Sequence, residues 1–95
     1  MTITKKTPGK MNRNLVYCQP LKPTGYLVIT SMPLSSGMLE IVFSASYKGN
    51  VYRKTEVVSS FSISDAPLDV WTSPDDSSLH LFSSDSRYDY WLTKR

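Results

Sequence analysis

Short runs of alternating apolar and polar residues recur along the chain, and turn-forming residues separate one run from the next. In the clearest run, residues 39–47, every second side chain is apolar and those between are mostly polar. A period of two places the two sets on opposite faces of a β-strand. Clusters of Pro, Gly, Ser and Asp interrupt every longer window, so no amphipathic helix of roughly ten or more residues is predicted. This pattern predicts an all-β protein.

Strand signals are found at residues 15–19, 25–32, 39–47, 51–63, 68–72, 79–82 and 87–93. Lys48, Gly49 and Asn50 join the third and fourth segments and tolerate the positive φ that a tight reversal requires. The length of the fourth segment and the break in its alternation at Val57 and Val58 predict a bulge or bend there. About six to seven short antiparallel strands fit either a small sandwich or a partly open barrel, and the pattern leaves both open.

The chain has 95 residues, a length that suits one domain with one core. Residues 1–14 are polar and show no sustained period, which predicts a mobile basic arm ahead of a single β-rich domain at 15–95. Residues 1–23 hold five basic residues and no acidic one, whereas residues 24–95 hold six basic and eight acidic ones, which leaves a net charge of −2. The overall charge of +3 therefore comes from the arm, and it is weak evidence that the folded domain binds nucleic acid.

Cys18 is the only cysteine, so the chain cannot be a disulfide scaffold of the secreted kind. Because it lies in the apolar run at residues 15–18, we expect it to be buried as a small hydrophobic residue. The basic start is not followed by the apolar segment of a signal peptide, and no apolar stretch approaches the ~20 residues needed to cross a bilayer. The sequence therefore predicts a small soluble cytoplasmic domain that does not span a membrane.

No residue pattern indicates catalysis, a metal site or a cofactor. His80 is the only histidine, and on a strand it projects away from Leu79 and Leu81. A general base oriented by Asp69 or Asp85 is less favoured than a surface histidine. One Cys and one His do not make a zinc site, and the chain has no glycine-rich phosphate-binding motif. We predict a protein that is not an enzyme.

Aromatic residues beside acidic ones indicate a binding surface. Trp71 and Asp69 share one face of a predicted strand, as do Trp91 and Asp89, so an aromatic ring lies beside a carboxylate on each. Protein interfaces are enriched in such rings, although they can also simply fill both faces of a thin sheet. The predicted partner-binding residues are Asp69, Trp71, Asp75, Asp76, Asp85, Asp89 and Trp91. This predicts a protein-binding module of the inhibitor, immunity or anti-defence type, with a basic protein as its partner.

A nucleic-acid-binding domain is the alternative hypothesis. The basic arm would contact phosphates, together with basic residues of the 47–54 hairpin, and an aromatic ring of the hairpin would stack on a base. The residues predicted for this role are Lys48, Arg53, Lys54 and Tyr52. The acidic character of the folded domain favours the protein-binding hypothesis over this one.

Overall fold

Seven antiparallel strands and no helix make up the computed structural model, which describes residues 13–63 and 67–95. The strands are β1 (Asn14–Pro20), β2 (Gly25–Pro33), β3 (Leu39–Tyr47), β4 (Asn50–Val58), β5 (Asp69–Thr72), β6 (Ser78–Phe82) and β7 (Asp89–Lys94). They form one sheet in the order β1-β2-β3-β4-β7-β6-β5, curled into a half-barrel. The predicted all-β class is confirmed, and of the two predicted architectures the partly open barrel is observed.

The predicted arm, residues 1–14, lies outside the described residues except for Arg13 and Asn14. Asn14 already belongs to β1, one residue before the predicted start of the folded domain. Arg13 extends over the outer face of the sheet, where its guanidinium donates to the hydroxyl of Thr30 at 2.8 Å and pairs with the carboxylate of Glu40. No helix long and apolar enough to cross a lipid bilayer occurs within the described residues.

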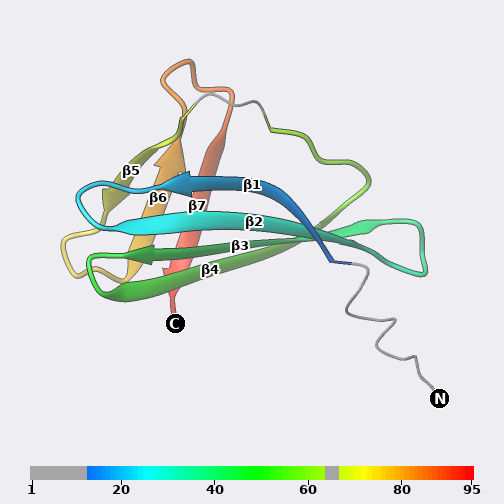
Figure 1. Cartoon of the computed structure of the whole chain (residues 1–95), viewed down its shortest axis with the longest axis horizontal. Coiled ribbons are helices and arrows are strands. Elements are labelled where there is room, and N and C mark those ends of the chain that lie inside the picture. Colours follow the sequence, from blue (N-terminus) through cyan, green and yellow to red (C-terminus); the bar gives the residue numbers. More distant parts are fainter. Residues whose placement is uncertain (1–12, 64–66) are drawn as a thin grey trace.

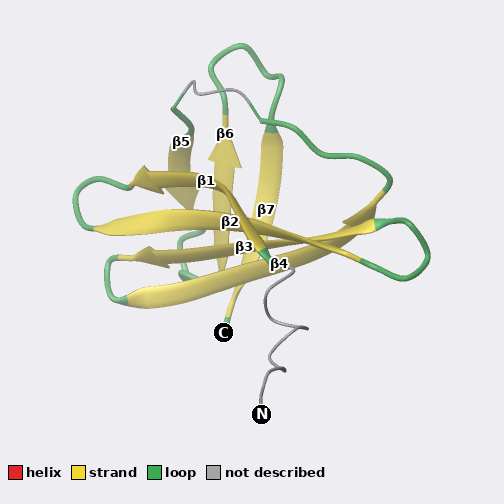
Figure 2. Cartoon of the chain, turned by 45° about the vertical axis from the view of Figure 1, so that its right-hand side comes forward, coloured by secondary structure: helices red, strands yellow, loops and turns green. Residues whose placement is uncertain are grey.

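The sheet folds over on itself where β4 meets β7. These strands pair only at Tyr52 with Lys94 and at Arg53 with Thr93, after which they diverge. Figure 1 shows the long strands β1–β4 running across the molecule with β5–β7 crossing behind them at a steep angle, and Figure 2 shows the same crossing from another side. The fold brings the two edge strands of the sheet, β1 and β5, towards each other, and the line between them is called the seam below.

The core lies between the inner faces of β1–β4 and β5–β7. Its buried residues are Leu21, Leu27, Ile29, Ile41, Phe43, Ala45, Tyr47, Tyr52, Leu68, Leu79, Leu81 and Leu92. Phe43 of β3 joins the two parts of the sheet, because its ring lies 4.5 Å from that of Tyr90 in β7. Burying each large apolar side chain contributes about 1.5–3 kcal/mol, so this layer supplies most of the force that holds the sheet folded over.

The sequence predicts a bulge or bend near Val57 and Val58, and the structure has a bend at Ser59, directly after the strand. β4 ends at Val58, and residues 59–63 leave the sheet instead of continuing it to residue 63. Leaving the sheet allows Phe61 to pack edge-on against Phe43, with the ring centroids 5.9 Å apart. The observed irregularity lies in β1, where the register shifts between Leu15 and Tyr17.

The bulge in β1 also corrects the expectation that Cys18 is buried, because Cys18 is exposed. One extra residue reverses the alternation of inward and outward side chains. After the bulge Tyr17 pairs with Ile29 on the inner face, which turns Cys18 to the outer face. Apolar neighbours in the sequence therefore did not predict the side of the sheet on which Cys18 lies.

The β3–β4 hairpin has the tight turn that the sequence predicts. Lys48 and Gly49 both have positive φ, at 50° and 84°, and Tyr47 pairs with Asn50 across the turn. Two central residues with positive φ match the right-handed twist of the strands that they join.

Candidate functional site

A cluster of aromatic rings covers the outer face of β5–β7. The register aligns Trp71 of β5, His80 of β6 and Trp91 of β7 in one row across the three strands. Leu79 and Leu81 on either side of His80, and Leu92 after Trp91, are fully buried, so the row faces away from the core. The side chains of Trp71 and Trp91 are 47% and 50% exposed, which is unusual for the largest apolar side chain.

The rings of this cluster contact one another. The imidazole of His80 stacks on the indole of Trp91, with centroids 4.1 Å apart and planes 5° from parallel. The indole of Trp71 meets that of Trp91 edge to face at 6.0 Å, and Phe82 lies 4.8 Å from His80. Cross-strand aromatic contacts of this kind hold the rings in place before any partner binds, which lowers the entropy lost on binding.

Two carboxylates lie beside the row of Trp71, His80 and Trp91, one on each side of Phe82. Asp69, Phe82 and Asp89 form a second row across the three strands, next to the first. An oxygen of Asp89 lies 2.6 Å from Nε2 of His80, whereas the carboxylate of Asp69 has no hydrogen-bond or ion-pair partner within the described residues. We call the outward side chains of both rows the acidic aromatic face: Asp69, Trp71, His80, Phe82, Asp89 and Trp91.

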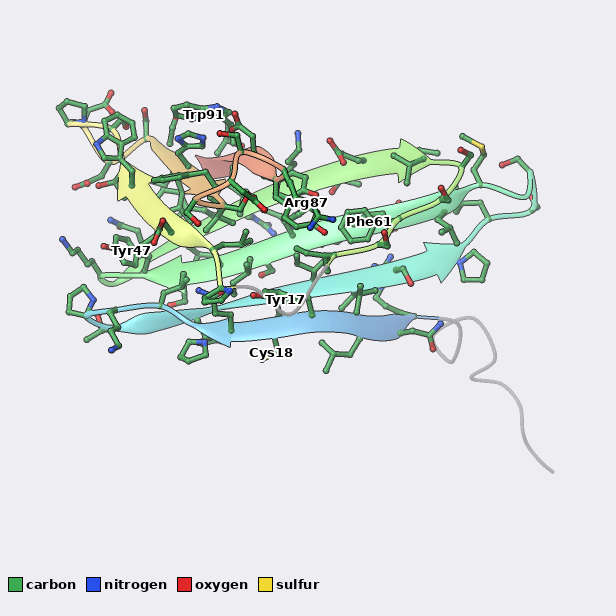
Figure 3. All side chains as sticks on the ribbon, turned by 90° about the horizontal axis from the view of Figure 1, so that it is seen from above. Tyr17, Cys18, Tyr47, Phe61, Arg87 and Trp91 are labelled. Atoms are coloured by element: carbon green, nitrogen blue, oxygen red, sulfur yellow. The ribbon has the colours of Figure 1, made fainter. Side chains whose placement is uncertain are left out.

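The acidic aromatic face lies on one side of the molecule. Figure 3 shows Trp91 on the side of the sheet that faces away from β1–β4, with Cys18 on the opposite side. No Lys or Arg side chain projects outward from the described strands β5, β6 and β7. The face therefore presents carboxylates and one imidazole among apolar rings.

Asp75 and Asp85, which the sequence predicts as partner-binding residues, stabilise the turns in which they lie. Asp75 accepts hydrogen bonds from the hydroxyls of Ser73 and Ser77, at 2.7 and 2.8 Å, and from the backbone N–H of Ser77. These bonds, the Ser73 hydroxyl first, lower the pKa of the Asp75 carboxyl from 3.8 to about 2. Asp76 lies at the tip of the same turn, with a φ of 61°.

The β6–β7 turn repeats the β5–β6 turn ten residues later. Asp85 accepts hydrogen bonds from the Ser83 hydroxyl at 2.7 Å and the Arg87 backbone N–H at 3.1 Å, and these lower its pKa. Ser86 has a φ of 64°, as Asp76 does in the first turn. The sequence Ser-x-Asp occurs in both turns, and it is the signal that could have identified these aspartates as turn residues. Of the seven predicted partner-binding residues, the structure brings Asp69, Trp71, Asp89 and Trp91 together and leaves the other three in turns.

The residues predicted for nucleic-acid binding do not form one surface. Tyr52 is fully buried and its hydroxyl donates to the carbonyl oxygen of Asp76 at 3.0 Å, so its ring is not available to stack on a base. Lys54 points inward and pairs with Glu56 at 3.3 Å, whereas Arg53 points outward. Lys48 lies in the β3–β4 turn, with its ammonium 5.3 Å from the ring centroid of Tyr47.

His80 has a carboxylate partner, which is Asp89 and not the predicted Asp69 or Asp85. A general base also needs a nucleophile or substrate proton within reach, and no Ser or Cys side chain contacts the imidazole among the described residues. The same part of the chain contains no group of three His, Cys, Asp or Glu side chains that could hold a metal ion. What the arrangement offers is a preformed contact surface.

A groove of about 510 Å³ runs along the seam, beside the acidic aromatic face. Leu21 and Tyr47 form part of one wall, and Leu68 and Val70 form part of the other. Gln19 crosses the seam: its amide Nε2 donates to the carbonyl oxygen of Leu68 at 2.9 Å, and its Oε1 accepts from the N–H of Leu68 at 2.8 Å. Sequence analysis missed this residue, because the two partners are 49 positions apart.

Comparisons of the chain with known protein families, with curated proteins and with solved structures give no match.

Proposed function

We propose that this chain is a small non-catalytic binding protein, of the inhibitor, immunity or anti-defence type, whose acidic aromatic face docks on a basic surface of another protein. The observation that carries the proposal is the half-exposed pair of indoles, Trp71 and Trp91, which contact each other in a row with His80 and lie beside two carboxylates in the next row. The single cysteine supports a reducing compartment such as the cytoplasm.

The energetics of protein interfaces support this role for the two tryptophans. Residues that dominate binding energy are enriched in Trp, lie near the centre of the interface and become fully desolvated on binding. Covering an indole that is already packed against its neighbours gains apolar contact at a small cost in side-chain entropy. Neither indole N–H has an acceptor within the described residues, so each is available to a partner.

The charge of the face supports a basic partner. Among the residues that the structure describes, Asp69 has no ion-pair partner, and the carboxylate of Asp89 is 64% exposed although it contacts His80. A partner that brings a Lys or Arg to this face gains ion pairs and cation–π contacts with the adjacent indoles. The same carboxylates steer a basic surface towards the face, so association is expected to slow as salt concentration rises.

The test is capture of a partner from native lysate of the source organism by the tagged full chain, with nuclease present. We expect Trp91→Ala to weaken capture of the partner by about 30-fold, the effect of losing about 2 kcal/mol at a dominant residue. The matched control is Tyr26→Ala on the outer face of β2. Tyr26 is 55% exposed, and its substitution removes an exposed aromatic ring elsewhere on the sheet.

Equal capture by the Trp91→Ala and wild-type chains would refute the proposed face. The aspartate variant for this assay is Asp69→Asn with Asp89→Asn, since Asp85 holds its own turn and its loss would confound the result. We expect the double variant to slow association more at low salt than at high salt. Capture that nuclease abolishes would show that nucleic acid, not protein, is retained.

A further inference from the structure

No described strand pairs with the edge of β5 that faces the seam. β5 is the last strand of the sheet, with β6 on its other side. In an antiparallel pair, alternate residues direct their N–H and C=O groups to the same side. Leu68 directs both groups across the seam to Gln19, and Ser73 donates to Ser78 in the opposite direction. Whether the alternation is counted from Leu68 or from Ser73, Val70 and Thr72 direct their backbone N–H and C=O groups into the seam.

Gln19 shows how a strand would fit there. A primary amide has the same donor and acceptor as a peptide group, and that of Gln19 makes both hydrogen bonds with Leu68 that a paired residue makes in a β-ladder. The side chain thus occupies the place that one peptide group would take in a strand between β1 and β5, where the described residues form none. Beyond Leu68 the groove reaches Val70, where the described chain supplies no further group of this kind.

We propose that an extended basic segment of the protein partner adds to the free edge of β5 as an additional strand and lies in the groove along the seam. This inference rests on the proposed function and names the recognition mode. Adding a strand to an exposed sheet edge supplies affinity through main-chain hydrogen bonds and specificity through alternate side chains. The proposal deepens the role of Asp69 and Trp71, because they lie both on β5 and on the acidic aromatic face.

The two sides of β5 determine the composition of the segment. On the outer side, its residues lie beside the unpaired carboxylate of Asp69 and the indole of Trp71, which favour Lys or Arg. On the inner side, they enter the groove near Leu21 and Tyr47, which favour apolar side chains. Lys22, the one basic residue that lines the groove, disfavours a basic residue on that side. The segment therefore alternates basic and apolar residues over about the length of β5, four residues.

The experiment starts from a random decapeptide library displayed on phage and selected on the full chain. We expect the enriched peptides to alternate basic and apolar residues. A fluorescein-labelled synthetic copy of the strongest one is then prepared with single N-methyl groups along its backbone. Methylation of an amide that faces β5 should weaken binding by about tenfold or more, because it removes a hydrogen bond and leaves a carbonyl of Val70 or Thr72 unpaired. Methylation of the amides between should change binding less than threefold.

Two measurements on the protein complement the peptide series. Amide exchange followed by NMR should slow at Val70 and Thr72 by at least about tenfold on saturation with the peptide, but not at Trp71, whose N–H already faces β6. Thr72→Pro removes an edge donor without removing a bond to β6, and proline is tolerated at such edge positions. We expect the variant to keep the circular dichroism spectrum of the wild type and to bind the peptide at least about tenfold more weakly.

Each outcome decides the inference. Alternating sensitivity to N-methylation together with loss of binding in Thr72→Pro establishes strand addition. Peptides that need Trp91 but show no alternation along the backbone would overturn strand addition and leave the proposed docking face intact. Selection that enriches no peptide with alternating basic and apolar residues would also overturn strand addition. Failure of the proposed function would appear in a different assay, as unchanged partner capture by the Trp91→Ala chain.

Discussion

The amide of Gln19 is expected to stabilise the folded state by about 2 kcal/mol through its contact across the seam. It makes two hydrogen bonds with the backbone of Leu68, at 2.9 and 2.8 Å. A neutral hydrogen bond contributes about 0.5–1.5 kcal/mol net, so the pair is worth about 1–3 kcal/mol. Gln19→Leu keeps the approximate size of the side chain and removes both bonds, together with the one that Gln19 Oε1 accepts from the Tyr17 hydroxyl at 2.6 Å, so Tyr17→Phe is measured beside it to subtract that third bond. In a domain of 60–100 residues a loss of about 2 kcal/mol lowers the melting temperature by roughly 8–16 °C.

The assay is urea unfolding followed by far-ultraviolet circular dichroism, with the free energy of unfolding obtained by linear extrapolation. The control is Cys18→Ser, one position away on the exposed face of β1, for which we expect a change below about 0.5 kcal/mol. If Gln19→Leu unfolds within about 0.5 kcal/mol of the wild type, the amide does not join the two edge strands. That result would also remove the structural basis for the strand position inferred at the seam.

Three further predictions concern other parts of the sheet. Gly25→Ala should lower the free energy of unfolding in urea by about 3–5 kcal/mol, because Gly25 has a φ of 129° and a Cβ there would lie 1.9 Å from a backbone oxygen of β3. Gly37 has a φ of 89° with open space around it, so Gly37→Ala should lower it by only about 1 kcal/mol. The pKa of Asp75 is lowered in the folded state, so its contribution to the free energy of unfolding is present above pH 3.8 and is lost as pH falls towards about 2. Asp75→Asn should therefore make stability fall less steeply over that interval, and the control Asp76→Asn should not. Cys18 is exposed, so Ellman's reagent should label it in the folded protein at a rate close to that of the urea-unfolded chain, and protection of 100-fold or more would contradict its position.

Strand positions were predictable where alternation and turn chemistry agree. The third strand has the predicted bounds, Leu39–Tyr47, and it is followed by the predicted turn at Lys48 and Gly49. Alternation also placed Trp71 on the same face as Asp69, and Trp91 on the same face as Asp89, but it left open which face of each strand is buried. Four of the residues that make up the acidic aromatic face were therefore identified before their spatial arrangement was known.

Features that depend on one extra residue or on distant pairing were not predictable in this way. The bulge before Tyr17 reverses the alternation in β1 and exposes Cys18, and nothing in the local sequence marks it. Cys18 lies among apolar residues in the sequence and is exposed, whereas Tyr52, which is followed by Arg53 and Lys54, is fully buried. His80 and Phe82 joined the face only once the register of β5, β6 and β7 was known.

The way in which β4 meets β7 has a consequence for how the chain folds. Of the six strand pairings among the described residues, five join strands that follow each other in the sequence, and only β4 with β7 does not. Hairpins close within microseconds, whereas closing a long loop carries a larger entropic cost and slows folding. The β1–β4 and β5–β7 meanders are thus expected to form from local contacts, and the junction at Arg53 and Thr93 to form last. Substitutions at the junction should therefore accelerate unfolding and leave the rate of folding almost unchanged.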